Sequence, residues 1–567
     1  MLRELYELSH HFKKPPLGYS EIGVMWAIEL SDKTPYLQKL TSKDKQGKDK
    51  DGEKLLVPDL RRNNDKALLI DDGAEYVFGI GERGERRHQL YLELLQQCID
   101  ATQDEGAKLV RDFIQNCDIE AIDSQVSAEI PPPNDKQGNP KERDRFWWYR
   151  DRIIFLLDSQ AVTQRPKIQE FWAEYYSREQ GTTPGTCLLT GEDRPTIRDK
   201  MPAMVKGVPN TQSSGAAIVS FDKAAYQAYG WDGNTNAPIG FVPAVAVHQT
   251  LDILLKDDSY HYRLGNQTFI FWGNREAEGI DPQFWDAPSE IAENLFKTPQ
   301  KPSELPDTEE SESFYLAVLK GNKGRIALSH WDERSTETLK ESALQFVECQ
   351  KLIEDGYALP VWRLRNAAFR EPNKEHTDRI DLALVRSALF GEALPENFAI
   401  KVIDRICQEQ DTMRSLDRAK ALAFYCRTTM KSNSETPRSE VFAYYLGRIA
   451  FLMHWAQYTA QNLSREDTNV SRSLRLLSST PAQVFPRLYE GCITNHLEDR
   501  QAQEKYGGIL KNLKKRLNEE FTALGYNPSK TKLPTTFNTR EQAQFFLGFG
   551  TARAEYFSKT SNAEDSE

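Results

Sequence analysis

The sequence predicts an α+β protein, with an N-terminal mixed domain of antiparallel sheet and helices followed by a C-terminal all-α helical bundle. Up to about residue 333, short apolar segments adjoin turns that contain Gly, Asn or Pro, which is typical of paired strands. Beyond that point, apolar residues recur with a helical period and strand patterns nearly vanish. Because 567 residues exceed the usual size of a single core, we predict two domains, residues 1–333 and 334–567.

Three strand pairs are expected in the N-terminal domain, each joined by residues that favour a tight turn. The expected pairs are 24–30 with the chain after Tyr36, 260–263 with 268–272, and 314–319 with 325–331. Three polar segments are expected to be mobile surface loops, because they lack the apolar residues that packing requires. They are Thr41–Lys54, the stretch that begins at Pro131, and Lys297–Ser313.

Several helices can be placed from their first residues. Residues 1–8 have the pattern of an amphipathic helix. Thr436 followed by Pro437 predicts an N-cap with proline at the first helical position. Thr539 with Gln542 predicts a capping box. Apolar residues at spacings of three and four then predict one buried stripe, made of Val441, Tyr445, Ile449, Leu452 and Ala456.

Composition excludes several classes of protein. No apolar run approaches the roughly 20 residues of a membrane span, and the first residues do not resemble an export signal. We therefore expect a cytoplasmic protein that does not associate with a membrane. The 7 cysteines form no CxxC pair and are expected to be reduced, buried thiols. No metal-ligand spacing, P-loop lysine or nucleophile elbow occurs, so we expect no metal, no cofactor and no catalytic activity.

The net charge opposes binding to a polyanion at long range. With 84 acidic and 73 basic residues, the formal net charge is -11. Any contact with nucleic acid must therefore depend on local patches. Candidate basic residues are Arg61 and Arg62, then Arg83, Arg86 and Arg87. For any single cluster, the interpretation that we favour is an ordinary solvated face.

A polar segment from Lys206 to Phe221 is the best candidate for recognition. Small and amide side chains follow a proline turn there, so the backbone can approach a flat polyanion while hydrogen-bonding groups stay exposed. Amide side chains offer donor and acceptor together and can read base edges. The candidate residues are Lys206, Asn210, Gln212, Ser213 and Ser214. The alternative is a polar turn that caps a strand from Ala216 to Phe221.

Two other motifs have competing interpretations. Residues 79–84 match a dinucleotide fingerprint after an expected strand at 75–78, but acidic residues in the turn disfavour phosphate, and a tight strand-to-helix turn is the alternative. The aromatic run 146–149 has residues that stack on bases in single-strand channels. Its alternative, which we favour, is a core segment that enters an apolar helix at 153–157.

Several segments together resemble the large subunit of the type I-C CRISPR interference complex, Cascade. They are Cys187–Glu192, Lys206–Phe221, Asn236–Pro238 and Thr268–Trp272 in the first half, with Pro15–Ser20, Leu56–Pro58 and Tyr76–Gly79 near the start. In the second half they are Ala443–Arg448, Ser479–Pro486 and Glu541–Phe549. The lysine-rich insertion at Thr41–Lys54 departs from the family pattern.

The resemblance implies a non-catalytic binding subunit. Such a subunit reads the protospacer-adjacent motif in double-stranded DNA, helps to unwind the duplex and stabilise the R-loop, and recruits a helicase-nuclease. Its partners would be crRNA, the Cascade backbone subunits and small subunits. The C-terminal helical domain resembles the small subunit, which the family makes from an internal start, here Met413 or Met430. The other hypotheses are a nucleotide-dependent enzyme that uses Gly79–Gly84, and a structural adaptor without DNA contact.

Overall fold

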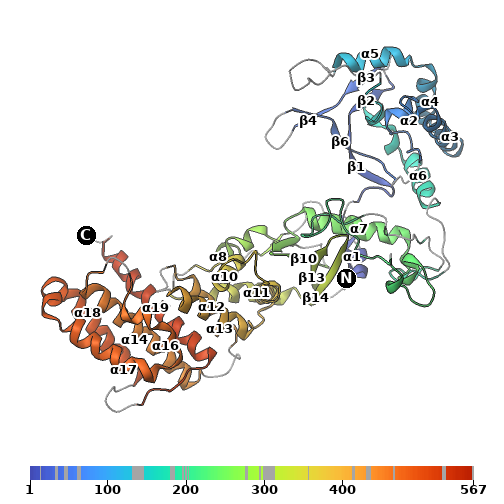
Figure 1. Cartoon of the computed structure of the whole chain (residues 1–567). Helices are drawn as coiled ribbons and strands as arrows, with labels where there is room; N and C mark the ends of the chain where they lie inside the picture. The colour runs from blue at the N-terminus through green and yellow to red at the C-terminus, as the bar shows by residue number, and fades with distance from the viewer. Residues whose placement is uncertain are drawn as a thin grey trace. The chain divides into compact units, whose positions relative to one another are not determined.

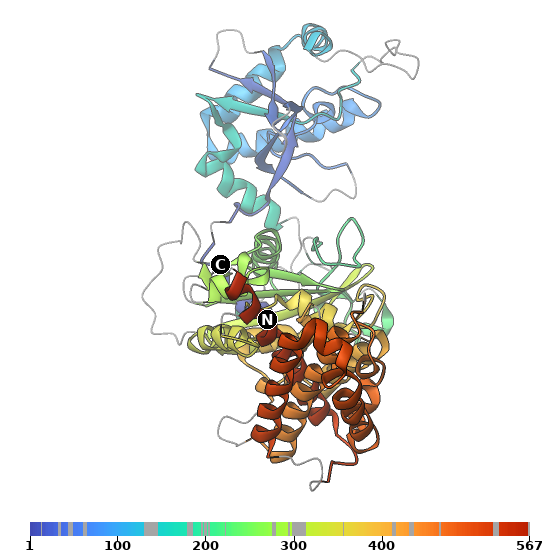
Figure 2. The same cartoon turned by 90° about the vertical axis from the view of Figure 1, so that its left-hand side faces the viewer.

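The computed structural model divides the chain into two compact units (Figures 1 and 2). Unit 1 contains residues 1, 205–216 and 252–567, and unit 2 contains residues 2–204 and 217–251. The structure describes residues 1–12, 14–31, 36–43, 49–60, 65–129, 146–178, 185–193, 197, 201, 204–221, 223–274, 279–292, 295–297, 313–354, 357–410, 415–429, 436–463, 466–525 and 532–564. Helices dominate the C-terminal part and small sheets lie in the N-terminal part, which confirms the α+β class.

Unit 2 is built on a four-stranded sheet in the order β3-β2-β7-β8. Its strands are β2 (Trp26–Glu29), β3 (Leu37–Lys39), β7 (Ile153–Leu157) and β8 (Gln160–Ala161). The central pair β2 and β7 is parallel, whereas β2 and β3 form the expected antiparallel pair. Two further pairs are antiparallel, β1 (Tyr19–Val24) with β6 (Glu53–Pro58) and β4 (Thr41–Lys43) with β5 (Asp49–Asp51).

The helices of unit 2 pack against this sheet through a separate core. That core joins Trp26, Phe155 and Trp172, which are fully buried. The helices of this core are α2 (Ala74–Val77), α3 (Gly84–Thr102), α4 (Glu105–Asn116), α5 (Ile119–Glu129) and α6 (Pro166–Arg178), whereas α1 (Leu2–Leu8) has its Leu2 in another cluster, with Met201, Ile239 and Ala244. Helix α1 is the expected first helix. Helix α7 (Phe241–Lys256) contains the division between the units, after Leu251.

Unit 1 begins with an antiparallel sheet in the order β14-β13-β10-β9. Its strands are β9 (His261–Leu264), β10 (Gln267–Gly273), β13 (Ser313–Asn322) and β14 (Arg325–Ser335). Pairing of β9 with β10 and of β13 with β14 confirms two predicted hairpins. A short pair, β11 (Gly279–Ile280) with β12 (Phe296–Lys297), and helix α8 (Pro288–Ile291) lie between them in the chain.

The helices of unit 1 follow the sheet directly. They are α9 (Glu337–Glu348), α10 (Val361–Ala368), α11 (Asp378–Phe390), α12 (Glu396–Glu409), α13 (Asp417–Thr428), α14 (Arg438–Ala460), α15 (Asn469–Arg472), α16 (Leu474–Ser479), α17 (Pro481–Cys492), α18 (Arg500–Leu524) and α19 (Thr539–Glu564). Strands do give way to helices near Ser335, but one hydrophobic core runs from Leu264 to Ala554 across that point. The compact units therefore divide the chain elsewhere than at residue 333.

A buried ion pair between helices α10 and α11 lies directly against the sheet of unit 1. The Arg365 Nε lies 3.0 Å from Asp381 Oδ1, and the Thr377 hydroxyl donates to Asp381 Oδ2 at 2.6 Å. Gly265, in the turn between β9 and β10, leaves so little room that a Cβ there would lie 2.8 Å from Arg365 Nη2 and 2.9 Å from Asp381 Oδ2. The hairpin therefore sits directly on the ion pair, which helps to explain why sheet and helices form one unit.

Helices α14 and α19 approach each other through their backbones. A Cβ on Gly447 would lie 1.8 Å from the Phe545 carbonyl oxygen, and a Cβ on Gly548 would lie 1.9 Å from the Tyr444 carbonyl oxygen. Only residues without a side chain allow this contact. Arg448, next to Gly447, hydrogen-bonds the carboxylates of Glu520 on α18 and Glu555 on α19. Two of the segments that carry the family resemblance therefore meet at one helix crossing.

The expected helix starts need correction by one residue. Helix α14 has Pro437 as its N-cap and Arg438 as its first residue, because Pro437 keeps an extended ψ of 141° and so lies at the boundary of the helix. The capping box of α19 is formed by Asn538 and Glu541, whose side chains each accept from the other's backbone N–H at 2.9 and 2.8 Å. In the expected stripe Val441 is exposed, because α14 turns that side toward solvent.

Four other expectations about local structure were wrong in whole or part. Residues 75–78 lie in and after helix α2 rather than in a strand, and 153–157 form strand β7 rather than a helix. Ala216 makes only an isolated bridge, so 216–221 is not a strand. Parts of Thr41–Lys54 are paired as β4 and β5. At residues 153–157 and in Thr41–Lys54, pairing with another strand overrides local propensity. Residues 131–145 and 298–312 lie outside the described residues.

Candidate nucleic-acid interface

The polar segment at 205–216 forms a closed loop in unit 1, called here the polar loop. Its ends are joined by reciprocal backbone hydrogen bonds, Val205 N to Ala216 O at 2.9 Å and Ala216 N to Val205 O at 2.8 Å. Its middle pairs with the turn between β13 and β14, where Gln212 N donates to Lys323 O at 3.0 Å and Lys323 N donates to Asn210 O at 2.9 Å. The loop is therefore fixed at its base and at its tip.

Close backbone contact explains the glycines around the polar loop. A Cβ on Gly321 of β13 would lie 2.2 Å from the Pro209 carbonyl oxygen, so the loop rests directly on the hairpin backbone. The Arg263 Nε donates to the Gly207 carbonyl oxygen at 3.1 Å and holds the opposite side. Asn210 has a φ of 62°, a left-handed angle that asparagine tolerates better than most residues. These contacts make the loop preorganised.

All five residues predicted in the polar loop occupy exposed positions. Lys206, Asn210, Gln212, Ser213 and Ser214 are each exposed. The backbone of the loop thus hydrogen-bonds to the turn between β13 and β14, while its amide and hydroxyl side chains face solvent. The alternative of a polar turn that caps a strand is not what the structure has, because no strand follows at 216–221.

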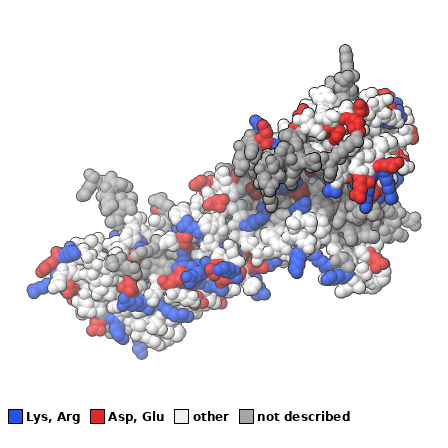
Figure 3. Space-filling model, turned by 45° about the horizontal axis from the view of Figure 1, so that its top comes forward, with Lys and Arg blue, Asp and Glu red and all other residues white. Residues whose placement is uncertain are grey.

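The polar loop and the hairpin turn beside it have no acidic residue of their own. Residues 204–221 and 322–331 contain no Asp or Glu, and Lys206 and Lys323 are both exposed. Arg263 donates to the backbone carbonyls of Gly207 and Leu255 rather than to an acid. On the face shown in Figure 3, basic and acidic side chains are both scattered among uncharged ones. Locally these segments are cationic, although the chain is acidic, and this favours a nearby polyanion.

The predicted arginine cluster lies in unit 2 and is largely neutralised. Arg87 contacts Glu75 and donates from Nη2 to Asp65 Oδ1 at 2.8 Å. Arg83 is exposed and lies 4.0 Å from Asp65 Oδ2. Arg86 is exposed, with Glu82 and Glu85 close in sequence. This cluster therefore offers a polyanion less net positive charge than its sequence suggests. Arg61 and Arg62 lie outside the described residues.

The turn at 79–84 lacks the strand that a dinucleotide site requires. Helix α2 precedes it, and a Cβ on Gly84 would lie 2.0 Å from the Gly79 carbonyl oxygen. Gly79 and Gly81 have φ angles of 70° and 86°, which favour glycine. Because the turn packs closely on itself, a bound phosphate is not needed to explain its glycines.

The aromatic run at 146–149 belongs to the core, as we favoured. Trp148 is fully buried and its Nε1 donates to Asp123 Oδ1 at 2.7 Å. Bases cannot stack on a ring without exposed faces.

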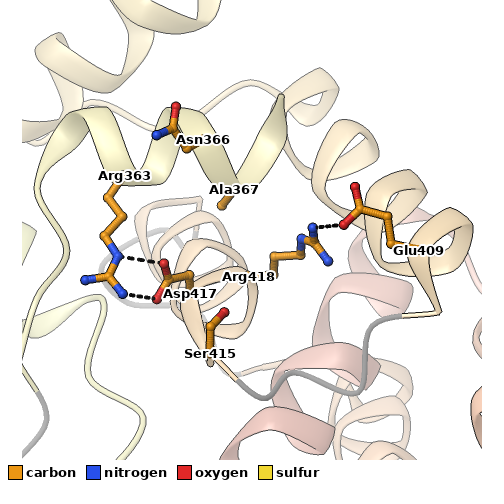
Figure 4. A pocket seen from close by; sticks show the side chains of 7 residues that line it. All are labelled: Arg363, Asn366, Ala367, Glu409, Ser415, Asp417 and Arg418. Atoms are coloured by element: carbon orange, nitrogen blue, oxygen red, sulfur yellow. Dashed lines mark hydrogen bonds and ion pairs between the residues drawn. The ribbon is translucent and has the colours of Figure 1, made fainter. Parts of the chain in front are cut away.

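An open cavity of about 350 Å³ lies among α10, α12 and α13 (Figure 4). Its two arginines are each neutralised by a carboxylate. Arg363 donates from Nε and Nη2 to Asp417 at 2.6 and 3.1 Å, and Arg418 contacts Glu409. Figure 4 shows both pairs across the lining. With its charges paired internally, the cavity attracts a charged ligand only weakly.

Sequence reasoning missed one group of exposed residues. Tyr226, Tyr229 and Trp231 of unit 2 all expose their rings. The available signal was three aromatic residues within six positions, separated only by Gln, Ala and Gly. Such a composition gives no aliphatic neighbours for a core.

Neither a metal site nor a membrane span occurs in the described ranges. No group of His, Cys, Asp or Glu there has the arrangement of a metal site. None of the helices in that part of the chain is long and apolar enough to cross a membrane. All 7 cysteines are free thiols, as expected, though Cys117 and Cys407 are only partly buried.

The fold and the polar loop define an α+β protein with a helical C-terminal part and a preorganised, locally cationic surface loop. Its sequence matches a family model described as "CRISPR-associated protein (Cas_Csd1)" over residues 2–557. Because the match covers nearly the whole chain, this protein belongs to the Cas_Csd1 family of CRISPR-associated proteins. A comparison with curated protein sequences found no match.

Proposed function

We propose that this chain is the non-catalytic large subunit of a crRNA-guided type I-C Cascade complex, and that the polar loop reads the protospacer-adjacent motif in double-stranded DNA. In this proposal the chain helps to unwind the duplex, stabilises the R-loop and recruits the helicase-nuclease. Its partners are crRNA, the backbone subunits, small subunits and target DNA in the cytoplasm. The family assignment supports the CRISPR setting.

The observation that carries the motif-reading role is the arrangement of the polar loop. Exposed amides reach outward from a backbone that is already hydrogen-bonded to the β13–β14 turn. Such side chains can bond to base edges without a large ordering cost at binding. Lys206 and Lys323 flank them and suit phosphate contacts, which position a protein without specifying sequence.

Target binding by the whole complex tests this role. In the variant Asn210→Gly, Gln212→Ala, Ser213→Ala, glycine keeps the left-handed backbone angle at residue 210. We expect electrophoretic binding to lose its preference for the correct motif, by about tenfold for each base that the loop no longer hydrogen-bonds. The matched control is Gln97→Ala, an exposed glutamine on α3. Unchanged discrimination in the triple variant would favour a structural adaptor without DNA contact.

Charge variants separate positioning from reading. We expect Lys206→Ala with Lys323→Ala to weaken binding to all duplexes alike, and to reduce the slope of log K against log salt by about 0.9 for each phosphate that the chain no longer neutralises. A change confined to the correct motif would contradict the assignment of these lysines to phosphate.

Catalysis by nucleotide turnover is the competing function. It predicts that a bulky residue in place of Gly81 abolishes nucleotide binding selectively. The helix that precedes the turn, where a dinucleotide site needs a strand, makes us favour the binding role.

Internal starts at Met413 or Met430 are part of the proposal that the C-terminal helical domain is also made separately as a small subunit. Both residues lie outside the described residues, and a shorter C-terminal product in cells that carry the intact gene would test it.

A further inference from the structure

Residues 223–236 of unit 2 form a surface loop with three exposed aromatic rings, called here the aromatic loop. The exposed fraction is 94% for Tyr229, 52% for Trp231 and 47% for Tyr226. In the same unit, Trp148 and Trp172 are fully buried. Exposing large rings gives up the free energy that their burial would provide. A cluster of them on one loop therefore suggests a binding role.

The backbone of the aromatic loop is held in place by one asparagine. Asn236 Oδ1 accepts from Ala228 N at 2.8 Å, and its Nδ2 donates to the carbonyl oxygens of Trp231 at 2.8 Å and Gly233 at 3.0 Å. Trp231 N also donates to Ala228 O at 3.0 Å. The segment on which Tyr229 and Trp231 stand is therefore a closed, preorganised turn. This also gives a physical role to the Asn236–Pro238 segment.

Tyr229 stands at the tip in a left-handed backbone conformation. Its φ is 56°, an angle that is uncommon for a bulky residue and costs free energy. Gly230 beside it has a φ of 74°. The turn thus holds an aromatic side chain out into solvent at a position where glycine or asparagine would be easier to accommodate. Strain of this kind concentrates at binding sites.

The surroundings of the rings fit stacked bases better than a protein surface. Residues 223–236 contain no Leu, Ile, Val, Met or Phe, so the loop adds no large aliphatic side chain to the three rings. Their neighbours in sequence are Ala, Gly and Gln, with one acid, Asp232, after Trp231; the small ones let a sugar–phosphate backbone come close to Tyr229. The centroids of Tyr229 and Trp231 lie 6.2 Å apart at an interplanar angle of 55°, so each ring presents its own face.

We propose that the aromatic loop binds unpaired bases of single-stranded nucleic acid, which stack on Tyr229 and Trp231. The proposal rests on the proposed function in one respect, since duplex opening by the complex would supply the unpaired bases. Stacking on protein rings is tolerant of sequence, because every base has a flat face. The loop would therefore hold a separated strand without reading it. Asn236 acts as a positioning residue through the backbone that carries both rings.

Binding of the full chain to a fluorescent oligothymidine of about 12 nucleotides, followed by anisotropy, tests the proposal. We expect Tyr229→Ala and Trp231→Ala each to weaken binding by about tenfold. Tyr229→Phe should bind like the parent chain, because it keeps the ring. Tyr229→Leu should bind like Tyr229→Ala, because leucine is apolar but has no flat face. Thermal melting checks that each variant is folded.

Several results would overturn the proposal. Absence of oligothymidine binding by the parent chain would do so, and so would equal affinity of the alanine variants. Full binding by Tyr229→Leu would identify a general apolar contact, such as a protein interface, instead of stacking. We expect Asn236→Ala to weaken oligothymidine binding by the parent chain. The same change should have no further effect when Tyr229 and Trp231 are already alanine, because a positioning residue acts only through the residues that it holds.

Two assays separate stacking on the aromatic loop from motif reading by the polar loop. Polar-loop variants are expected to lose motif discrimination on duplex DNA and to keep oligothymidine binding. Aromatic-loop variants are expected to lose oligothymidine binding and, in the whole complex, to keep motif discrimination on a target whose adjacent segment is already unpaired. If the polar-loop variants keep motif discrimination, the proposed function has failed. If the aromatic-loop variants keep oligothymidine binding, the stacking proposal has failed.

Discussion

The crossing of α14 with α19 and the aromatic loop use unusual backbone arrangements for opposite purposes. At the crossing, Gly447 and Gly548 lack side chains so that two helices can touch through backbone atoms. In the aromatic loop, Tyr229 adopts a left-handed angle and keeps a ring almost wholly in solvent. The first arrangement adds buried contacts between helices, whereas the second leaves a large ring without buried contacts. The contrast separates residues that hold the fold from residues that present a surface.

This contrast divides the segments that carry the family resemblance. Ala443–Arg448 and Glu541–Phe549 meet at the helix crossing, whereas Asn236–Pro238 supports the aromatic loop and Lys206–Phe221 includes the polar loop. Substitutions in the first pair should change stability without changing recognition. Substitutions in the second pair should do the reverse. The following predictions test that division in order of expected effect on stability.

The largest effect is expected for Gly447→Ala. In an open helix this change stabilises, but here the new Cβ would lie 1.8 Å from the Phe545 carbonyl oxygen. We expect a loss of about 3 kcal/mol or more in the free energy of unfolding, measured by denaturant titration. Gly508→Ala is the matched control, because nothing lies within 4 Å of that position on α18, and it should stabilise by up to about 1 kcal/mol. Similar effects of the two changes would contradict the close crossing.

Removal of Arg448 should have the next largest effect. Burial alone would lower the pKa of Arg448, but hydrogen bonds to Glu555 and Glu520 raise it above its ordinary value. Arg448→Met leaves the mostly buried Glu520 carboxylate without its partner, and we expect a loss of about 3 kcal/mol in the free energy of unfolding. Arg472→Met breaks the exposed pair with Asp467 and should leave the unfolding midpoint unchanged. A small effect of Arg448→Met would show that the crossing depends on packing alone.

The stability of unit 2 should depend on pH through Asp71. Burial raises the pKa of Asp71 to about 7, although hydrogen bonds from Thr163 and the Phe155 N–H and the charge of Arg152 act in the other direction. The folded state therefore binds more protons than the unfolded state between about pH 4 and pH 7, so stability falls as pH rises through that range.

Between pH 5 and pH 7.5 this shift in pKa corresponds to a fall in the free energy of unfolding of at most about 2.5 kcal/mol. Asp71→Asn resembles the protonated carboxyl, and denaturant titrations at pH 5 and pH 7.5 should show a smaller fall for this variant than for the parent chain. If the free energy of unfolding falls as much in Asp71→Asn as in the parent chain, groups other than Asp71 cause the pH dependence.

The smallest effect on stability is expected for Tyr229→Gly. Glycine adopts the left-handed angle without strain but adds flexibility to the unfolded chain, so the two contributions offset each other to within about 1 kcal/mol. Oligothymidine binding should nevertheless fall as it does for Tyr229→Ala. A strong loss of stability would place Tyr229 among the residues that hold the fold, and would remove the contrast with Gly447.

Much of the fold was predictable because its signals are local. The hairpins at 260–272 and 314–331 depend on apolar alternation around a turn, and the structure has both. The helical C-terminal part follows from apolar spacing in the same way. One error arose because pairing with a distant segment decides the conformation. Residues 153–157 are apolar enough for helix or strand, and they form β7 because β2 offers a parallel partner.

The candidate site was predictable only in part. The amides and lysine of the polar loop were found from composition, and the structure exposes all of them. Lys323 and Arg263 were missed, because they reach the loop from other parts of the sheet. The ion pairs of Arg87 with Asp65 and Glu75 were also invisible in the sequence. Sequence shows which charges exist, but only folding brings a neutralising partner to them.

The sequence by itself determined the α+β class, two hairpins, the helical C-terminal part and the polar character of residues 206–214, because each depends on neighbours a few positions apart. The tertiary structure decided that one core joins the β9–β14 sheet to the helices, that Gly447 and Gly548 lie at a helix crossing, and that Tyr229 and Trp231 remain outside any core. These features depend on contacts between residues distant in the chain, and no local pattern of side chains specifies such contacts.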